Sequence, residues 1–171
     1  ARKKKDTDFA SRWERMPERI KESFVGLFWY PEESFLADYV DEQGQNRFIR
    51  PNQIIACSLP YGMLSDAMKL DVIDKVHRHL LTPKGLRTLS PRNPLYKGHY
   101  GGEQPTRDRA YHQGTVWPWL LEHYVKAGFD MHGKKFLNEA EDILKNFEED
   151  ISVSGIASIN EIYDGDPPHC P

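Results

Sequence analysis

Apolar residues recur at three- and four-residue steps in separate stretches of this chain, which places them along one side of a helix. The first stretch runs from Phe9 to Phe24, with Pro17 as a kink or restart. A second follows Ser65, which can cap a helix. A third carries Pro118 in its first turn and ends near Gly128, and a fourth runs from Phe136 to Phe147. The apolar positions of the four stretches are Phe9, Trp13, Met16, Ile20 and Phe24; Met68, Val72, Val76 and Leu80; Val116, Leu120, Tyr124 and Val125; and Phe136, Ala140, Ile143 and Phe147. No strands alternate with them, so the predicted class is all-α.

The segments between these stretches are irregular. Residues 27–40 predict a minor hairpin-like excursion, with a turn at 44–46, and Pro51–Leu59 can form a short helix. Thr82–Gly85 stops the following helix. Residues 86–113 show no sustained periodicity and are broken repeatedly by Gly and Pro. A loop this long inside a compact domain is usually functional, so we expect a site there.

The composition is that of one globular domain covering residues 1–171. A formal net charge of −3 leaves no basic field for nucleic acid or an anionic membrane, and the basic run Arg2–Lys5 is interpreted as a solvated end. No apolar run approaches the roughly 18 residues of a membrane span, so we expect a cytoplasmic protein. The chain starts at Ala1 and ends in an unfinished loop, and we expect it to be a piece of a longer protein.

Cofactor chemistry finds no support in the sequence. Cys57 and Cys170 are far apart and lack a CxxC spacing, so they are predicted to be free thiols. The seven histidines show no zinc motif such as HExxH. We therefore expect neither a metal nor another cofactor.

The segment Tyr111–Trp119 (YHQGTVWPW) has the mixture of side chains that a sugar requires. The CH faces of a sugar stack on aromatic rings, and its hydroxyls need planar polar partners. Asp108 and His112 can grip vicinal hydroxyls, and Gln113 can both donate and accept hydrogen bonds. Trp117 or Trp119 would supply a stacking face. Core packing is the alternative, equally acceptable for Trp117 and preferred for Trp119, and His112 by itself would more often be structural.

Glycoside hydrolysis needs one carboxylic acid to protonate the leaving oxygen and one carboxylate to activate water or to attack carbon. Glu161 is the best candidate for the carboxylate, because it follows the apolar segment 156–159 and precedes Ile162 and Tyr163, which could keep it partly desolvated. From the local sequence alone, a helix cap or a partner for an arginine is the simpler interpretation.

Four blocks of the sequence together resemble the C-terminal domain of bacterial- and archaeal-type glycogen debranching enzymes, the amylo-α-1,6-glucosidases. The blocks are Arg50-Pro51-Asn52-Gln53, Gly85-Leu86-Arg87-Thr88-Leu89-Ser90, Tyr111–Trp119 and Ser158–His169. The resemblance covers nearly the whole chain. It implies an (α/α)₆ toroid, of which this chain would be roughly the second half, with long loops at the active-site end.

The resemblance also implies roles for individual residues. Related (α/α)₆ glycosidases carry their catalytic base in the loop before the last helix, where Glu161 stands, so Glu161 becomes the predicted general base of an inverting hydrolysis of α-1,6-linked glucosyl stubs. The substrate would be glycogen or a branched α-glucan. The substrate-binding residues expected with it are Asn52, Gln53, Arg87, Asp108, His112, Gln113, Trp117 and Tyr163. An ion pair for Arg87 and a helix cap for Asn52 or Gln53 remain alternatives.

The general acid of this family belongs to a Trp-Met-Asp type motif, which this chain lacks. Asp38, Glu103, Asp108 and Asp164 lie in other contexts, so the isolated chain is expected to be inactive. Half a toroid would also expose apolar faces around Trp13, Phe24 and the Phe136–Phe147 stripe, which favours self-association in place of the rest of its own barrel. The alternatives are another (α/α)₆ glycosidase, trehalase-like or processing-glucosidase-like, and a carbohydrate-binding module without catalysis.

Overall fold

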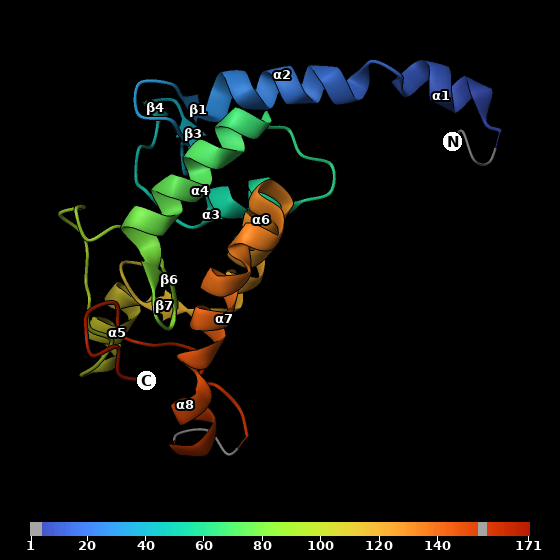
Figure 1. Cartoon of the computed structure of the whole chain (residues 1–171). Helices are drawn as coiled ribbons and strands as arrows, with labels where there is room; N and C mark the ends of the chain where they lie inside the picture. The colour runs from blue at the N-terminus through green and yellow to red at the C-terminus, as the bar shows by residue number, and fades with distance from the viewer. Residues whose placement is uncertain (1–4, 154–156) are drawn as a thin grey trace.

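A computed structural model describes residues 5–153 and 157–171 of the chain (Figure 1). Its helices are α1 (Thr7–Trp13), α2 (Met16–Phe28), α3 (Asn52–Ser58), α4 (Asp66–Leu80), α5 (Gln104–Ala110), α6 (Leu121–His132), α7 (Leu137–Lys145) and α8 (Glu148–Val153), with 3₁₀ turns η2 (Pro118–Leu120) and η3 (Gly133–Phe136). Its strands are β1 (Trp29–Tyr30), β2 (Phe35–Leu36), β3 (Val40–Asp41), β4 (Gly44–Gln45), β5 (Leu81–Thr82), β6 (Gly85–Arg87) and β7 (Val116–Trp117). Residues 2–4 of the basic run and Ile156 of the apolar segment before Glu161 lie outside the described residues.

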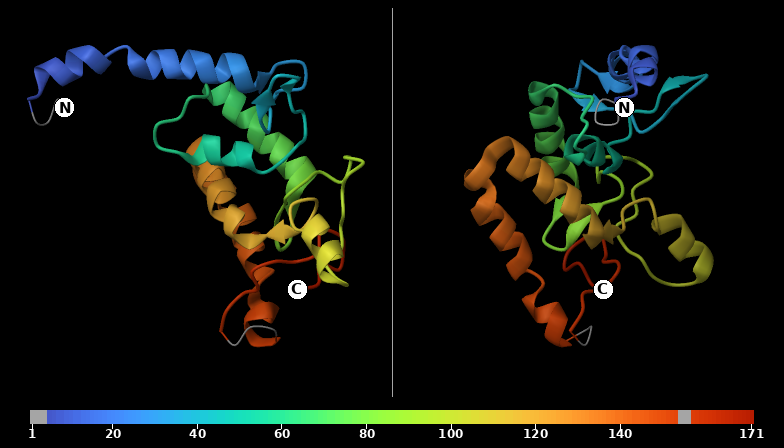
Figure 2. Two further views of the ribbon diagram at one scale, coloured as in Figure 1. Left: turned by 180° about the vertical axis from the view of Figure 1, so that it is seen from behind. Right: turned by 90° about the vertical axis from the view of Figure 1, so that its right-hand side faces the viewer.

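The first predicted helix is two helices that form an arm projecting from the body (Figures 1 and 2). Asp6 caps α1 by accepting a hydrogen bond of 3.0 Å from the Phe9 amide. Pro17 lies in the first turn of α2, where a missing amide hydrogen costs nothing, so the proline restarts the helix rather than kinking it. No residue of either helix is buried, and the part of the arm that packs against the core is the end of α2, at Phe24, Val25 and Phe28.

The predicted excursion after the arm consists of two small antiparallel hairpins. Strand β1 pairs with β2, and β3 pairs with β4. Gly44 has φ +104°, a conformation that costs little without a Cβ atom, and it begins β4 directly after the turn. Helix α3 follows, with Pro51 immediately before its first residue, which agrees with the short helix predicted for Pro51–Leu59.

The core lies between α3, α4, α6 and α7. Ser65 caps α4 through a 3.3 Å hydrogen bond from the Met68 amide, and the predicted stripe places Val72, Val76 and Leu80 inside. The main apolar residues that meet them are Ile54, Leu86, Val116, Leu120, Tyr124, Phe136, Ile143 and Phe147. This part of the helix prediction is confirmed.

A three-stranded antiparallel sheet, in the order β5-β6-β7, was not predicted. Thr82–Gly85 is the turn of a hairpin rather than a simple helix stop, and Val116 lies in a strand rather than in a helix. At Gly85, with φ +146°, a Cβ atom would lie 2.9 Å from the backbone of Trp117, so glycine permits the close approach of β6 and β7. The predicted class, all-α with a minor hairpin, is therefore corrected to a helical domain with several small antiparallel sheets.

Two helix boundaries also differ from the prediction. Pro105 sits in the first turn of α5 and begins a helix inside the segment that was predicted to be irregular. Helix α6 continues past Gly128 to His132 and ends at Gly133, whose φ is +58°. Gly128 instead packs under Phe136, because a Cβ atom there would overlap the Phe136 ring.

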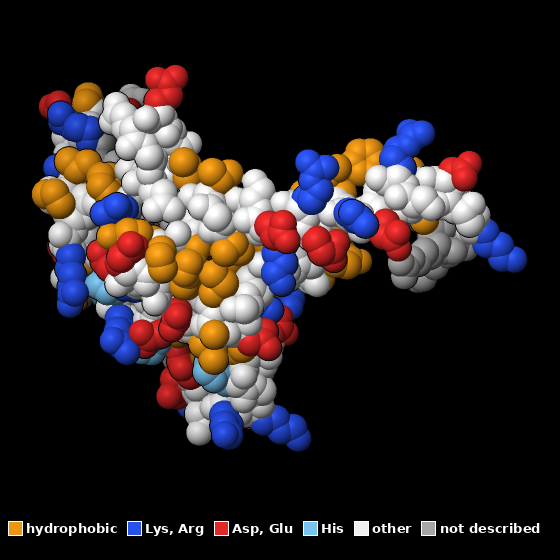
Figure 3. Space-filling view, turned by 90° about the horizontal axis from the view of Figure 1, so that it is seen from above, with side chains coloured by type: hydrophobic (Ala, Val, Ile, Leu, Met, Phe, Trp, Pro, Cys, Tyr) orange, Lys and Arg blue, Asp and Glu red, His pale blue; other side chains and the backbone are white. Residues whose placement is uncertain are grey.

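The exposed apolar surface differs from the one expected. Trp13 is 44% exposed and Phe24 is half-buried, but the stripe from Phe136 to Phe147 is buried, so that part of the expectation is wrong. The exposed apolar residues of α7 are Leu137 and Leu144, which lie off the stripe. From above, hydrophobic side chains gather on the body near the base of the arm (Figure 3). Among the described helices, none combines the length and apolar character needed to cross a membrane.

Candidate functional site

A groove of about 230 Å³ lies where the start of α3 faces η2. It brings together side chains from three parts of the chain, and its lining is Pro51, Asn52, Thr88, His112, Trp117, Trp119 and Leu120. Three predicted substrate-binding residues, Asn52, His112 and Trp117, thus line one groove. A ligand here meets indole, imidazole and amide groups together, which suits a molecule with both apolar faces and hydroxyls.

A larger cavity of about 560 Å³ lies between α4 and α7, and three of its polar side chains, those of His77, Tyr124 and Glu139, bond to one another. The Tyr124 hydroxyl donates to Glu139 Oε1 at 2.6 Å and lies 2.8 Å from His77 Nδ1. A polar ligand there would have to replace these bonds. The smaller groove is therefore the better candidate.

The aromatic wall of the groove is built by ring contacts within one segment. The His112 and Trp117 rings stack, 13° from parallel with centroids 6.2 Å apart, and Tyr111 meets Trp117 edge-on at 4.8 Å. Trp117 Nε1 also donates a 3.3 Å hydrogen bond to the Tyr111 carbonyl. The indole of Trp117 therefore has a fixed orientation on the groove wall.

Trp119 is the second indole of the groove, and sequence reasoning favoured the core for it. It is 55% exposed, because the 3₁₀ turn η2 buries its neighbours Pro118 and Leu120 and turns Trp119 outward. Its ring packs edge-on against His123, with centroids 6.0 Å apart, and His123 Nδ1 lies 2.8 Å from Ser58 Oγ. The signal that could have found it is Pro118, which begins a turn at that point.

Arg50 lies behind the groove and connects its segments, a role that sequence reasoning missed. Its Nε lies 3.1 Å from Asp38 Oδ2, and its Nη2 donates to Gln113 Oε1 at 3.0 Å. Its Nη1 donates to the Thr88 carbonyl at 2.9 Å and also to the His112 carbonyl. Gln113 is thus held by Arg50 and does not line the groove.

Glu161 is exposed and does not have the partly desolvated position that its apolar neighbours predicted. It lies near Tyr111: partial burial raises the pKa of the Tyr111 phenol, and the negative charge of Glu161 raises it further. Within residues 5–153 and 157–171, Glu161 neither caps a helix nor forms an ion pair. Its carboxylate is accessible to water, and neither Glu161 nor Tyr111 is among the residues that line the groove.

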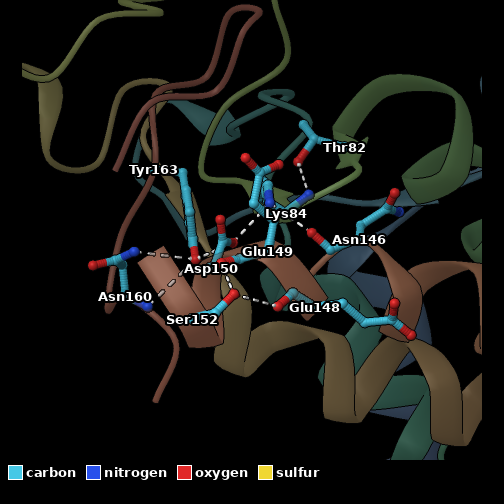
Figure 4. Close-up of polar contacts among 9 residues, drawn as sticks. All are labelled: Thr82, Lys84, Asn146, Glu148, Glu149, Asp150, Ser152, Asn160 and Tyr163. Atoms are coloured by element: carbon cyan, nitrogen blue, oxygen red, sulfur yellow. Dashed lines mark hydrogen bonds and ion pairs between the residues drawn. The ribbon is translucent and has the colours of Figure 1, made fainter. Parts of the chain in front are cut away.

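The chain around Glu161 is anchored by Tyr163, which is only 1% exposed (Figure 4). The Tyr163 hydroxyl donates to Asp150 Oδ2 at 2.8 Å and accepts a 3.3 Å bond from the Asn160 amide. Lys84 Nζ lies 2.7 Å from the same Asp150 oxygen. The Tyr163 backbone also pairs with Val116, through bonds of 2.8 and 3.0 Å.

This burial corrects the prediction that Tyr163 binds substrate, because its ring and hydroxyl face the core. The β-bridge to Val116 makes the residue a short extension of the sheet, and such residues carry apolar or aromatic side chains for packing. Tyr163 therefore anchors the loop that bears Glu161.

Two further contacts hold the same C-terminal loop. Arg87 Nε donates a 2.8 Å hydrogen bond to the Gly165 carbonyl, so Arg87 has the structural role that was its alternative interpretation. Asp164 accepts bonds from the Tyr100 amide at 2.7 Å and lies 2.8 Å from His99 Nδ1. Residues 99–100 of the long irregular segment therefore lie against the Glu161 loop.

Two further predicted site residues, like Arg87, Gln113, Glu161 and Tyr163, are not among those that line the groove. Asp108 is exposed on α5 and is not among the groove-lining residues. Gln53 is buried and donates a 3.0 Å bond to the Arg50 carbonyl, while its Oε1 has no hydrogen-bond partner among the described residues. Neither of them faces the groove formed by His112, Trp117 and Trp119. Over the same described residues, no group of three or more His, Cys, Asp or Glu side chains could hold a metal ion.

Aromatic grooves and accessible carboxylates on loops are typical of glycosidases, which stack sugars and act on them with carboxylic acids. The whole chain, residues 1–171, matches the family described as amylo-alpha-1,6-glucosidase. The chain therefore belongs to this family.

One curated relative is the glycogen debranching enzyme of Saccharomyces cerevisiae. The two sequences are 29% identical over 92 residues, which covers 50% of this chain. The matched part spans only 6% of the yeast protein, so the similarity concerns a small piece of that enzyme.

Proposed function

We propose that this chain forms roughly the second half of an (α/α)₆ catalytic barrel at the C-terminal end of a bacterial- or archaeal-type glycogen debranching enzyme. The barrel would hydrolyse α-1,6-linked glucosyl stubs on glycogen or a branched α-glucan in the cytoplasm, with inversion at the anomeric carbon. Membership of the amylo-alpha-1,6-glucosidase family supports the reaction class. The groove with two indoles supports a sugar as the ligand.

The observation that carries this proposal is that the charge of Glu161 acts on the phenol of Tyr111, whose ring contacts Trp117 of the groove. A sugar stacked on the indoles would bring its anomeric carbon toward this end of the groove. Glu161, exposed to water, would accept a proton from a water molecule as that water attacks the carbon. Asn52 and His112 would hold hydroxyl groups, because both line the groove and carry polar side-chain atoms.

An inverting hydrolysis also needs an acid that protonates the leaving oxygen, at roughly 6.5–9.5 Å from the base. Among the described residues that line the groove, none is a carboxylic acid. We assign the acid to the other half of the barrel, so the 171-residue chain alone would bind glucan without cleaving it. The same absent half would cover the exposed apolar face of α1 and α2, and without it the chain would self-associate.

A second candidate function is a carbohydrate-binding module without catalysis. The lack of a carboxylic acid among the described groove-lining residues favours it. A third, another (α/α)₆ glycosidase, would differ in the linkage that it cleaves. Product analysis separates the three.

The test is to incubate the intact protein that carries this domain with a dextrin bearing single α-1,6-linked glucosyl stubs, and to follow the products by proton NMR. We expect free glucose that first appears as the β anomer, since inversion converts the α linkage. Trehalose and linear maltooligosaccharides serve as control substrates. Release of α-glucose would contradict inversion, hydrolysis of trehalose alone would favour the other glycosidases, and binding without any hydrolysis would favour the module.

A further inference from the structure

The side chain of Arg50 is 15% exposed and is shared among three segments that are distant in the sequence. Its guanidinium contacts Asp38 at 3.1 Å, the Thr88 carbonyl at 2.9 Å, Gln113 Oε1 at 3.0 Å and the His112 carbonyl. A guanidinium has five N–H donors in a rigid plane, so one residue can hold all these acceptors at once.

Two groove residues depend on the acceptors that Arg50 holds. On one side, Asp38 Oδ1 accepts a 2.8 Å hydrogen bond from Asn52 Nδ2, while Asp38 Oδ2 pairs with Arg50. On the other side, Arg50 binds the carbonyl of His112 itself. Arg50 therefore connects Asn52, through Asp38, to the backbone of His112. Arg50 itself does not line the groove.

The indole of Trp117 is linked to the same bridge through the neighbouring residue. Trp117 Nε1 donates to the Tyr111 carbonyl, one peptide unit before His112, and the Trp117 ring stacks on the His112 ring. The segment that carries these residues follows a long irregular stretch with little regular structure besides α5. Its position is set by the pairing of β7 with β6 and by the bonds of Arg50, which tie it to the residues just before α3.

We propose that Arg50 is a positioning residue, which fixes the width of the groove by bridging Asp38 and Asn52 on one wall to His112 and Trp117 on the other. Lysine cannot replace it, because an ammonium group has three donors on a flexible stem and cannot reach the acceptors of both walls in one plane. The identity of the ligand, an α-glucan, rests on the proposed function. The bridging role of Arg50 does not depend on the proposed function.

The test uses Arg50→Lys in the ¹⁵N-labelled 171-residue chain, with Arg78→Lys as the matched control. Arg78 pairs with Asp74 on the exposed surface of α4 at 2.8 Å. The chain has four tryptophans, so four indole N–H signals report on four places. We expect Arg50→Lys to shift the signals of Trp117 and Trp119 and to leave those of Trp13 and Trp29 unchanged. Arg78→Lys should move none of them.

The same variants are titrated with maltotriose and with panose, which carries one α-1,6 linkage. Loss of charge-assisted bonds from one wall predicts a dissociation constant at least about tenfold higher for Arg50→Lys and unchanged for Arg78→Lys. Native indole signals with native affinity in Arg50→Lys would overturn the proposal. If the wild-type chain binds neither sugar, the proposed ligand is wrong, and the indole shifts still decide the role of Arg50.

Should Arg50→Lys fail to fold, Asp38→Asn decides the question. It preserves the shape of the side chain and removes the charge that pairs with Arg50. The wall that carries Asn52 then loses its link to Arg50, and the wall that carries His112 and Trp117 is no longer tied to it. We expect a folded protein in which the Trp117 indole signal shifts and sugar binding weakens. A folded Asp38→Asn variant with unchanged indole signals would refute the bridge.

Discussion

The imidazole of His112 stacks on the indole of Trp117, with the ring planes 13° apart and the centroids at 6.2 Å. Both rings line the groove, and Tyr111 packs edge-on against each of them at 4.8 Å. Because the two rings stack, His112 and Trp117, which are five positions apart in the sequence, form one continuous surface of the groove. A ligand in contact with either ring therefore depends on the orientation of both.

This stack predicts that His112→Ala and Trp117→Phe have coupled effects on sugar binding. Residues in direct contact show interaction energies of about 0.5–3 kcal/mol in double-mutant cycles, whereas distant residues are additive. We expect coupling above about 0.5 kcal/mol for panose binding, measured by calorimetry. The control cycle pairs His112→Ala with Trp13→Ala on the arm and should be additive. Additivity in both cycles would show that the two rings act separately.

Trp119 and Trp13 are comparably exposed, at 55% and 44%, but only Trp119 lines the groove. If the indole of Trp119 is a stacking platform, Trp119→Ala should raise the dissociation constant for maltotriose by about tenfold. Trp13→Ala should leave it unchanged, because Trp13 lies on α1. The comparison is made by titration of the 171-residue chain, and equal effects of the two substitutions would remove Trp119 from the site.

The anchor under Glu161 predicts a stability effect. Tyr163→Phe removes the hydroxyl that donates to Asp150, a residue only 8% exposed, and leaves one oxygen of a buried carboxylate with fewer partners. We expect the free energy of unfolding in urea to fall by about 1–3 kcal/mol. Tyr61→Phe is the control, since Tyr61 is 93% exposed. A Tyr163→Phe variant as stable as the control would mean that the hydroxyl contributes little to holding the loop.

The two cysteines should differ in reactivity. Burial raises the pKa of the Cys57 thiol to about 12, so it carries almost no thiolate at pH 8, whereas Cys170 is exposed. One thiol should therefore react rapidly with a disulfide reagent at pH 8 and the second only in denaturant. In the unfolded chain the thiol has its ordinary pKa near 9, so above pH 9 the unfolded state loses this proton while the folded state keeps it. The free energy of unfolding should therefore fall as the pH rises from 9 toward 12. Fast modification of both thiols in the native protein would contradict the packing of α3.

The elements that sequence reasoning predicted correctly are those with several concordant local signals. Helix α4 has a serine cap, at Ser65, and an apolar residue at every fourth position from Met68 to Leu80. The same reasoning missed β5, β6 and β7, because strands of two or three residues are too short to show alternation. Pro105 was interpreted as a break, although proline in a first turn begins a helix.

In the candidate site, the types of residue could be predicted from the sequence, but the directions in which their side chains point could not. The segment Tyr111–Trp119 predicted an aromatic site, and His112 and Trp117 do line the groove. Which tryptophan faces outward depends on η2, a single 3₁₀ turn that no periodicity reveals. The role of Arg50 depends on residues up to 63 positions away and so could not be found from local sequence.

The central claim, that Glu161 is the general base, is tested most directly by Glu161→Gln in the intact enzyme. The substitution preserves shape and removes the charge that would accept the proton of the attacking water. The measurement is the rate of glucose release from a dextrin with α-1,6-linked stubs, with thermal unfolding recorded in parallel. Glu141→Gln on the exposed side of α7 is the matched control. We predict a kcat at least about 10²-fold lower for Glu161→Gln, with an unchanged Tm and a control at the wild-type rate; glucose release near the wild-type rate by a folded Glu161→Gln enzyme would contradict the assignment.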